Sequence, residues 1–124
     1  CETLLSVRVD ESLYFANARF LEDRLLELVT ERPTVTDVVL VCSAVNGIDG
    51  SAVETLESVN ERLHVAGVRF HLSEVKGPVM DALKRTDLLR HLSGELFFTQ
   101  HEAVQRLARD ASVPPTPTPV RRTG

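Results

Sequence analysis

The sequence predicts a single α/β domain, in which strands and helices alternate along the chain. Segments with strand-like alternation or continuous apolar runs take turns with segments whose apolar residues recur at helical spacing. Such alternation implies a sheet with a parallel portion and helices beside it. The length of 124 residues suits one domain, and 43% hydrophobic residues with only 5% aromatic residues predict a modest aliphatic core.

The N-terminal third is predicted to form a β-hairpin followed by a helix. Residues 4–9 read as a strand, and Leu13–Phe15 is expected to be a second short strand that pairs with them. The spacing becomes helical after Asn17, which is a suitable N-cap, and Pro33 marks the end of that helix.

The middle of the chain is predicted to supply the central strand. The apolar run Val38–Cys42, rich in β-branched residues, is expected to be buried on both faces. A helix is expected over residues 52–66, ended by Gly67, and a strand over residues 68–72. Cys42 is expected to be a buried, reduced thiol without chemistry, because free cysteines are so often buried.

The C-terminal third is predicted to add a helix that opens at Gly77-Pro78, a short strand at Leu96–Phe98 and a last helix over residues 100–109. The predicted whole is a central mixed β-sheet with an N-terminal hairpin and about four helices packed on it. Residues 1–111 are expected to form this domain. Residues 112–124 are rich in proline and are expected to form an extended, disordered tail.

The segment Asn46-Gly47-Ile48-Asp49-Gly50-Ser51 is predicted to be a partner-binding and regulatory loop. It follows the central strand and opens the second helix, and in open α/β sheets sites lie beyond the carboxyl ends of strands. A structural role competes at Ser51, because Ser51-Ala52-Val53-Glu54 matches the capping box. We expect capping to be the main role of Ser51, and Asp49 to add favourable charge at the helix start.

The sequence carries no visible catalytic motif. It has no G-x-S-x-G elbow, no phosphate-binding P-loop and no G-x-G-x-x-G fingerprint. The histidines His64, His71, His91 and His101 lack the spacing of metal ligands, so neither a metal nor a cofactor is expected. A net charge of -4 argues against nucleic acid as a partner. We therefore expect a protein that binds other proteins and is not an enzyme.

Three segments resemble the STAS domain, the module named for sulfate transporters and anti-sigma-factor antagonists. Ile48-Asp49-Gly50-Ser51-Ala52 resembles its hallmark, an Asp with small residues that opens a helix after a strand. Ser12–Ala18 resembles the segment that opens the version attached to bacterial SulP-type anion transporters. Val75-Lys76-Gly77-Pro78-Val79, followed by Leu83-Lys84-Arg85, resembles the third-helix segment of that version. The resemblance covers about Leu4 to Arg109 and implies the STAS fold.

What the resemblance implies is the cytosolic C-terminal regulatory and interaction domain of a SulP-type transporter of sulfate or bicarbonate-like anions. Such a domain lies at the cytoplasmic face of the inner (plasma) membrane, as part of an integral membrane protein. The expected partners are the transmembrane domain of the same transporter and other cytosolic regulatory proteins, with weak anion or nucleotide binding as a further expectation. The alternative is a stand-alone anti-sigma-factor antagonist. Such antagonists carry a phosphorylatable Ser directly after the Asp, where this chain has Gly50, and this departure favours the transporter.

Overall fold

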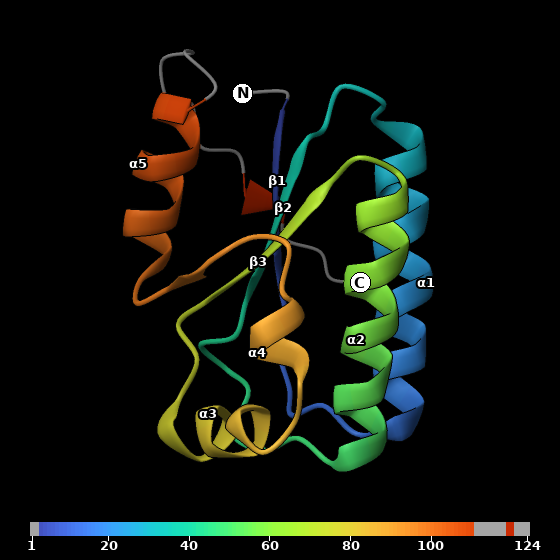
Figure 1. The fold of residues 1–124 in the computed structure, drawn as a ribbon, viewed down its shortest axis with the longest axis vertical. Helices are drawn as coiled ribbons and strands as arrows, with labels where there is room; N and C mark the ends of the chain where they lie inside the picture. The colour runs from blue at the N-terminus through green and yellow to red at the C-terminus, as the bar shows by residue number, and fades with distance from the viewer. Residues whose placement is uncertain (1–2, 111–118, 121–124) are drawn as a thin grey trace.

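A computed structural model describes residues 3–110 and 119–120, which form an open sheet with helices on both faces (Figure 1). The strands lie in the order β4-β3-β2-β1-β5, and every described pairing between them is parallel. In chain order the elements are β1 (Leu4–Arg8), α1 (Phe15–Glu31), β2 (Asp37–Val41), α2 (Gly50–Val65), β3 (Arg69–Ser73), α3 (Gly77–Lys84), α4 (Leu88–His91), β4 (Leu96–Phe97), α5 (Gln100–Asp110) and β5 (Pro119–Val120).

β2 lies at the centre of the sheet, which confirms the prediction for the run that ends at Cys42. All five of its residues are buried. Val39 of β2 lies opposite Ser6 of β1 on one side and opposite His71 of β3 on the other. A strand with a neighbour on each side satisfies its backbone groups within the sheet, so only its side chains need cover from other elements.

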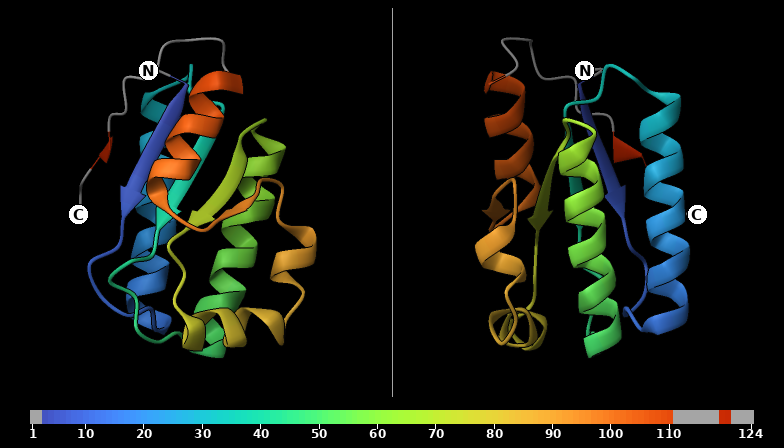
Figure 2. Two further views of the ribbon diagram at one scale, coloured as in Figure 1. Left: turned by 90° about the vertical axis from the view of Figure 1, so that its left-hand side faces the viewer. Right: turned by 45° about the vertical axis from the view of Figure 1, so that its right-hand side comes forward.

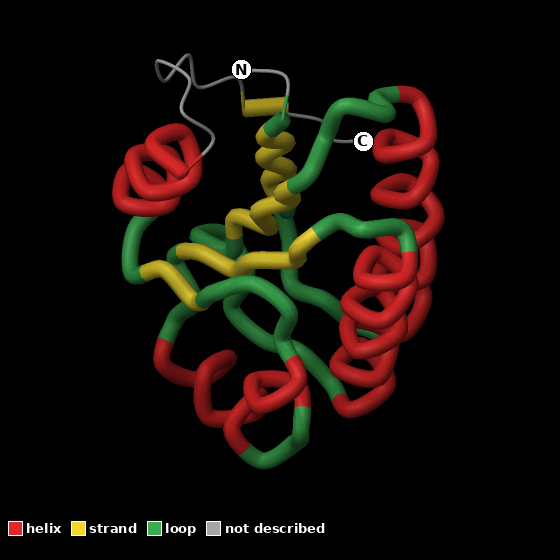
Figure 3. The backbone as a smooth tube through the Cα atoms, turned by 45° about the horizontal axis from the view of Figure 1, so that its top comes forward, coloured by secondary structure: helices red, strands yellow, loops and turns green. Residues whose placement is uncertain are grey.

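The two faces of the sheet are covered unequally. α1 and α2 lie side by side over one face, whereas α5 lies over the other (Figures 2 and 3). Successive residues of β2 alternate between these faces: Val38 and Leu40 belong to the large core under α1 and α2, and Val39 and Val41 belong to a smaller core. The smaller core, under α5, consists of Leu4, Val39, Val41, Phe97, Ala103 and Leu107.

The predicted N-terminal hairpin is wrong, and the described sheet is parallel rather than mixed. Leu13 does not pair with β1 but forms an isolated parallel bridge with Ile48. Its backbone N–H donates to Gly47 O at 3.0 Å, and its carbonyl accepts from Asp49 N at 3.2 Å. Leu13 therefore finds its partners in the distant loop after β2, while Phe15 already begins α1.

The start of α1 also differs from its prediction. Asn17 is not the N-cap, because the helix begins at Phe15 and Asn17 lies in its first turn. From there its Oδ1 accepts a hydrogen bond from Tyr14 N at 2.7 Å, and its Nδ2 donates to Ser12 O at 2.7 Å. From its position in the first turn, Asn17 thus holds residues 12–14, which lead into the helix.

The described residues contain five helices rather than about four, because the third predicted helix is divided. α3 ends at Lys84, where the Thr86 hydroxyl donates to Leu83 O at 2.8 Å and accepts from Leu88 N at 3.3 Å. These bonds form a turn between α3 and α4. The predicted end of α2 is confirmed, since Gly67 has a φ of +81°, a left-handed conformation that favours glycine.

The predicted tail falls largely outside the described residues, which include only Pro119–Val120 of it. These two residues form β5, in which Pro119 lies opposite Ser6 and Val120 opposite Val7 of β1. An edge strand tolerates a proline because the missing N–H is not needed on the outer side of the sheet. Pro119 therefore joins the sheet at its edge, beside β1.

A polar cluster centred on the buried residues Asp37 and His71 lies on the sheet face that α5 covers. Asp37 Oδ1 lies 2.8 Å from His71 Nε2 and 3.0 Å from Arg69 Nε, and Asp37 Oδ2 accepts from the Thr36 hydroxyl at 2.9 Å. His71 Nδ1 accepts from the backbone N–H of Glu95 at 2.9 Å, so the neutral ring carries its proton on Nε2, directed at Asp37. Burial raises the pKa of Asp37, but the bonds from His71 and Thr36 and the charge of Arg69 outweigh it and hold that pKa below 3.8.

Gly94 is the position where this cluster leaves no room for a side chain. Its N–H donates to Phe70 O at 3.0 Å, which brings its backbone against β3. A Cβ atom on Gly94 would lie 2.5 Å from Phe70 O and still closer to His71 Nδ1. By contrast, a Cβ atom on Gly77, the first residue of α3, would meet nothing within 4 Å.

We predict opposite effects for alanine at these two glycines. Gly94→Ala should lower the free energy of unfolding by about 3 kcal/mol, because the methyl group forces β3 and the segment before β4 apart. Gly77→Ala should raise it by about 0.5 kcal/mol, because it restricts the unfolded chain without strain. Urea unfolding of both variants measures the difference. Equal effects would contradict the close approach of Gly94 to β3.

Asp37→Asn should remove part of the acid sensitivity of the fold. Because the folded state holds the pKa of Asp37 below 3.8, its contribution to stability is present above that value and is lost as the pH falls through the folded pKa. The variant should be about 2 kcal/mol less stable at neutral pH and lose less stability on acidification. Urea unfolding measured from neutral pH to about pH 3 tests this. Asp81→Asn, at an exposed position on α3, is the control and should keep the wild-type pH dependence.

Candidate functional site

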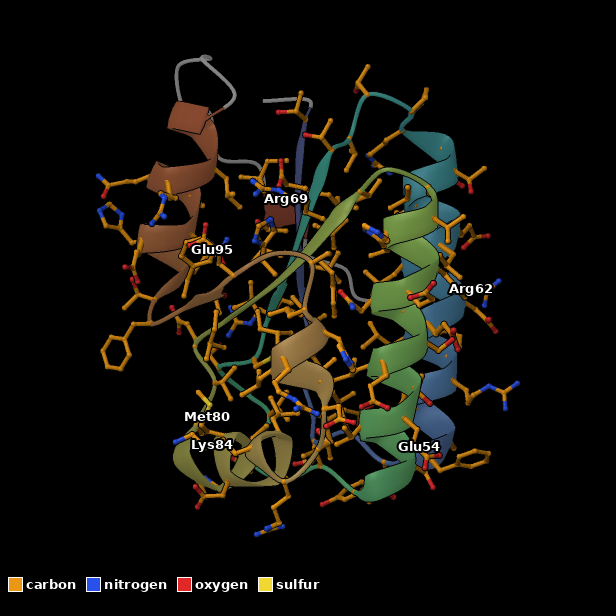
Figure 4. The ribbon with its side chains drawn as sticks, in the orientation of Figure 1. Glu54, Arg62, Arg69, Met80, Lys84 and Glu95 are labelled. Atoms are coloured by element: carbon orange, nitrogen blue, oxygen red, sulfur yellow. The ribbon has the colours of Figure 1, made fainter. Side chains whose placement is uncertain are left out.

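The loop of residues 46–51 lies at the carboxyl end of β2 and runs into the first residues of α2. α3 lies at the same end of the molecule, so that Met80 and Lys84 on α3 and Glu54 near the start of α2 all lie at the bottom of Figure 4. The predicted loop therefore occupies the end of the parallel sheet at which α/β folds place binding sites. Asn46, Gly50 and Ser51 are exposed, and Gly47, Ile48 and Asp49 are partly buried.

Ser12 holds the first half of the loop. Its hydroxyl oxygen accepts hydrogen bonds from two consecutive backbone amides, Asn46 N at 3.2 Å and Gly47 N at 3.0 Å. Next to this contact, Leu13 exchanges backbone bonds with Gly47 and Asp49, as described above. The segment of residues 12–13 thus supports the loop in the way that a neighbouring strand would, although it is only two residues long.

Two side chains fix the exposed side of the loop. Lys76 Nζ, just before α3, donates to Asn46 Oδ1 at 2.6 Å. A Cβ atom on Gly47 would lie 3.1 Å from the hydroxyl oxygen of Tyr14, so the hydroxyl end of the tyrosine packs against this glycine. The loop is therefore held by the segment before α1 and by the segment before α3, and it forms a preordered surface.

Asp49, and not Ser51, caps α2. Asp49 Oδ1 accepts from Ala52 N at 2.8 Å, and Asp49 has the extended backbone of an N-cap. The expected Ser51–Glu54 capping box is wrong, because α2 begins at Gly50 and Asp49 already satisfies the free amide. Asp49 was expected only to add favourable charge at the helix start, but it lies two residues before Ser51 and is an equally good capping residue, and the helix begins in the register that uses it. The exposed hydroxyl of Ser51 is consequently not concealed by capping.

Gly50 is an open position of the loop. It is exposed, it lies in the first turn of α2, and a Cβ atom there would meet nothing within 4 Å. Its φ lies outside the left-handed region, so a side chain is tolerated by the backbone as well as by the surroundings. A partner can therefore approach the backbone at Gly50 closely, and a larger residue there would block that approach without disturbing the fold.

Cys42 directly follows β2 and is buried, as expected. Burial raises the pKa of its thiol to about 12, which leaves almost no thiolate at neutral pH. The thiol also lies 3.6 Å from Leu40 O, inside the sheet. Cys42 therefore contributes packing to the base of the loop.

Two hollows of the described surface lie away from the loop. One of about 240 Å³ lies between β1 and α1 and is lined mainly by apolar residues such as Val9 and Leu21. Another of about 590 Å³ lies between α2 and α4, next to His64 and His91. Neither is lined by residues 46–51, and within residues 3–110 and 119–120 no group of His, Cys, Asp or Glu is arranged to hold a metal ion. The loop is thus a surface on the outside of the domain rather than the wall of a cavity.

The residues that sequence reasoning missed are those that support the loop from a distance in sequence. Ser12 and Tyr14 precede the loop by more than 30 residues, and Lys76 lies 30 residues after its partner Asn46. Ser12 and Tyr14 fall in a segment that resembled the transporter-linked domain, which was the available signal. Tyr14 is also more than half exposed, which places one large exposed side chain beside Gly47 of the loop.

A model of the STAS domain family matches residues 2–103 of the chain. The chain is 32% identical over 113 residues to the Arabidopsis thaliana protein named "Probable sulfate transporter 4.2" and 31% identical over 113 residues to "Sulfate transporter 4.1, chloroplastic" of the same plant. Each match covers 82% of the chain but only 17% and 16% of the respective relative. The chain thus spans about a sixth of the length of these relatives.

Solved structures show the same fold. The STAS domain of a SulP transporter from Vibrio cholerae superposes with a TM-score of 0.74 at 20% identity, covering 89% of this chain and 84% of that one. The murine Slc26a9 anion transporter matches with a TM-score of 0.72 at 17% identity, over 83% of this chain and 17% of that chain. The anti-sigma factor antagonist SpoIIAA matches with a TM-score of 0.60 at 15% identity, over 82% of this chain and 88% of that chain. None of the helices within residues 3–110 is long and apolar enough to cross a membrane.

Ser12→Ala should loosen the loop without unfolding the domain. The variant removes the shared acceptor of the Asn46 and Gly47 amides, so we expect these amides to exchange with solvent roughly tenfold faster. Hydrogen exchange followed by NMR measures each amide separately. Ser43→Ala, at a partly buried serine in the same β2–α2 connection, is the control and should leave both amides unchanged. Unchanged exchange in Ser12→Ala would mean that the loop is ordered by other contacts.

Proposed function

The chain belongs to the STAS domain family, and from that membership we propose that it is the cytosolic C-terminal regulatory and interaction domain of a SulP-type membrane anion transporter. The observation that carries the proposal is the similarity to sulfate transporters over 82% of the chain. The transported anion would be sulfate or a bicarbonate-like anion, and the transmembrane domain of the same transporter would be the first partner. The domain would then lie at the cytoplasmic face of the inner (plasma) membrane.

We propose that the domain acts by binding and not by catalysis, with residues 46–51 as its partner-facing surface. Support comes from the contacts of the loop, which Ser12, Leu13 and Lys76 hold in place before any partner arrives. A preordered loop loses little conformational entropy when it binds, and the exposed backbone at Gly50 lets a partner come close. The exposed ring of Tyr14 beside Gly47 would add apolar contact area at the same surface.

The alternative is a stand-alone anti-sigma-factor antagonist that works by partner switching. The similarity of fold to SpoIIAA is compatible with it. Against it stands Gly50, which has no hydroxyl at the place where the resemblance puts a phosphorylatable Ser. The exposed Ser51 is one place further on, and a phosphate there would meet the carboxylates of Asp49 and Glu54. Control through other cytosolic regulatory proteins, or through a weakly bound anion or nucleotide, remains part of the proposal for the transporter domain.

The gene gives the first test of this proposal. We expect the reading frame upstream of residue 1 to encode a series of hydrophobic helices, as a SulP-type transporter requires. A start codon a few residues upstream, with no such helices, would overturn the proposal in favour of the stand-alone antagonist.

The second test blocks the loop in the full-length protein. Gly50→Arg should lower the uptake of radiolabelled sulfate by cells that express the transporter roughly tenfold, because the added side chain projects into the space a partner needs. Gly77→Arg is the matched control, since it also adds a side chain to an open glycine in the first turn of a helix. Both variants should reach the membrane in normal amounts and melt like the wild type. Sulfate uptake at the wild-type rate by the Gly50→Arg variant would show that residues 46–51 are not the partner-facing surface.

A further inference from the structure

The two faces of the sheet differ in chemistry as well as in cover. On the face under α1 and α2, the buried strand residues are all apolar. On the face under α5, four polar residues are buried among the apolar ones: Ser6 of β1, Asp37 of β2, and His71 and Ser73 of β3. The parallel register sets them on one face, since His71 lies opposite Val39 and Ser73 opposite Val41.

Few of the described side chains of α5 attach it to this face, and one of them is polar. Ala103 and Leu107 are buried in the smaller core, and Val104 packs against it. Gln100 makes the polar attachment: its Oε1 accepts from the Ser73 hydroxyl, and its Nε2 donates to the Ser6 oxygen, both at 2.8 Å. The pair Arg106–Glu95 adds a contact at 3.2 Å that is largely exposed, beside α5 (Figure 4), and contributes little.

Two further hydrogen bonds at the start of α5 join residues 98–102 to one another. Thr99 Oγ1 accepts from Glu102 N at 3.0 Å, and Glu102 Oε1 accepts from Phe98 N at 3.0 Å. Because these bonds are local, the first turn keeps them when the helix leaves the sheet. The backbone N–H of Gln100 also donates outward, to Glu74 Oε2 at 2.9 Å.

We infer that α5 is a reversible cover, which lifts from the sheet while β1–β3, α1 and α2 stay folded. When it lifts, the hydroxyls of Ser6 and Ser73 exchange their bonds with Gln100 for bonds with water, which costs little. Among the described side chains, the apolar surface that becomes exposed belongs to the six residues of the smaller core and to Val104, which packs against them. Separation of α1 and α2 would instead expose the large core, so α5 opens at a lower free energy than the domain unfolds.

The open state uncovers a surface opposite to the one that α1 and α2 cover. Leu4, Val39, Val41 and Phe97 would face solvent there, with Ser6 and Ser73 among them. The occupant of this surface is α5 itself, through Gln100, Ala103 and Leu107. The fold thus contains a two-state element that is independent of the loop of residues 46–51.

Native-state hydrogen exchange of the 124-residue chain tests this inference. Amides of residues 103–107 in α5 should exchange at least about 100-fold faster than those of residues 38–40 in β2, by an opening that depends less on urea than global unfolding does. The inference is overturned if both sets of amides exchange at one rate with one urea dependence. This comparison needs no substitution, so it stands even if a variant fails to fold.

A pair of glutamine variants tests the named contacts. Gln100→Ala removes the bonds to Ser6 and Ser73 and should speed exchange in α5 roughly tenfold further, with β2 unchanged. Gln105→Ala is the matched control, because it makes the same substitution at an exposed position of the same helix and should change α5 exchange less than about twofold. If both variants have the same effect on α5, the polar attachment does not control the cover and the inference is wrong.

Discussion

The burial of β2 on both faces is the constraint on which the rest of the structure depends. A strand that contributes Val38 and Leu40 to one core and Val39 and Val41 to another requires cover from both sides. The parallel arrangement of the strands provides this cover. The chain must run back to the same end of the sheet before each new parallel strand, and a helix that packs on the sheet makes that crossover. The positions of α1 and α2, and the place of the loop that follows β2, result from this requirement.

The order and type of the main elements could be predicted from the sequence because they depend on local patterns. The run that ends at Cys42, the helix that Gly67 ends and the short strand at Leu96–Phe97 each have a periodicity of their own. The prediction of a hairpin failed because the apolar run Leu13–Phe15 does not itself show which segment it pairs with. Its pairing partner lies far along the chain. Leu13 pairs with Ile48, 35 positions further along the chain, and no local sequence pattern contains that information.

The candidate site shows the same division between local and distant causes. The loop was predictable because a small, polar segment between a strand and a helix has few other interpretations. Its support was not, since Ser12 and Lys76 reach it only through the arrangement of the sheet. The sequence analysis assigned the cap of α2 to Ser51, although Asp49 is an equally good capping residue. Because Asp49 is the cap, Ser51 stays exposed and its hydroxyl is not used for capping.

The two edge strands of the sheet determine how easily copies of the domain could associate edge to edge. β4 and β5, the outermost strands among the described residues, contribute two residues each, and β5 begins with Pro119. Such a short edge strand offers very few backbone hydrogen bonds to a strand of another molecule. Proline reduces their number further, because it has no backbone N–H. The sheet therefore limits its own growth, which protects a domain with five parallel strands from polymerising edge to edge at high local concentration.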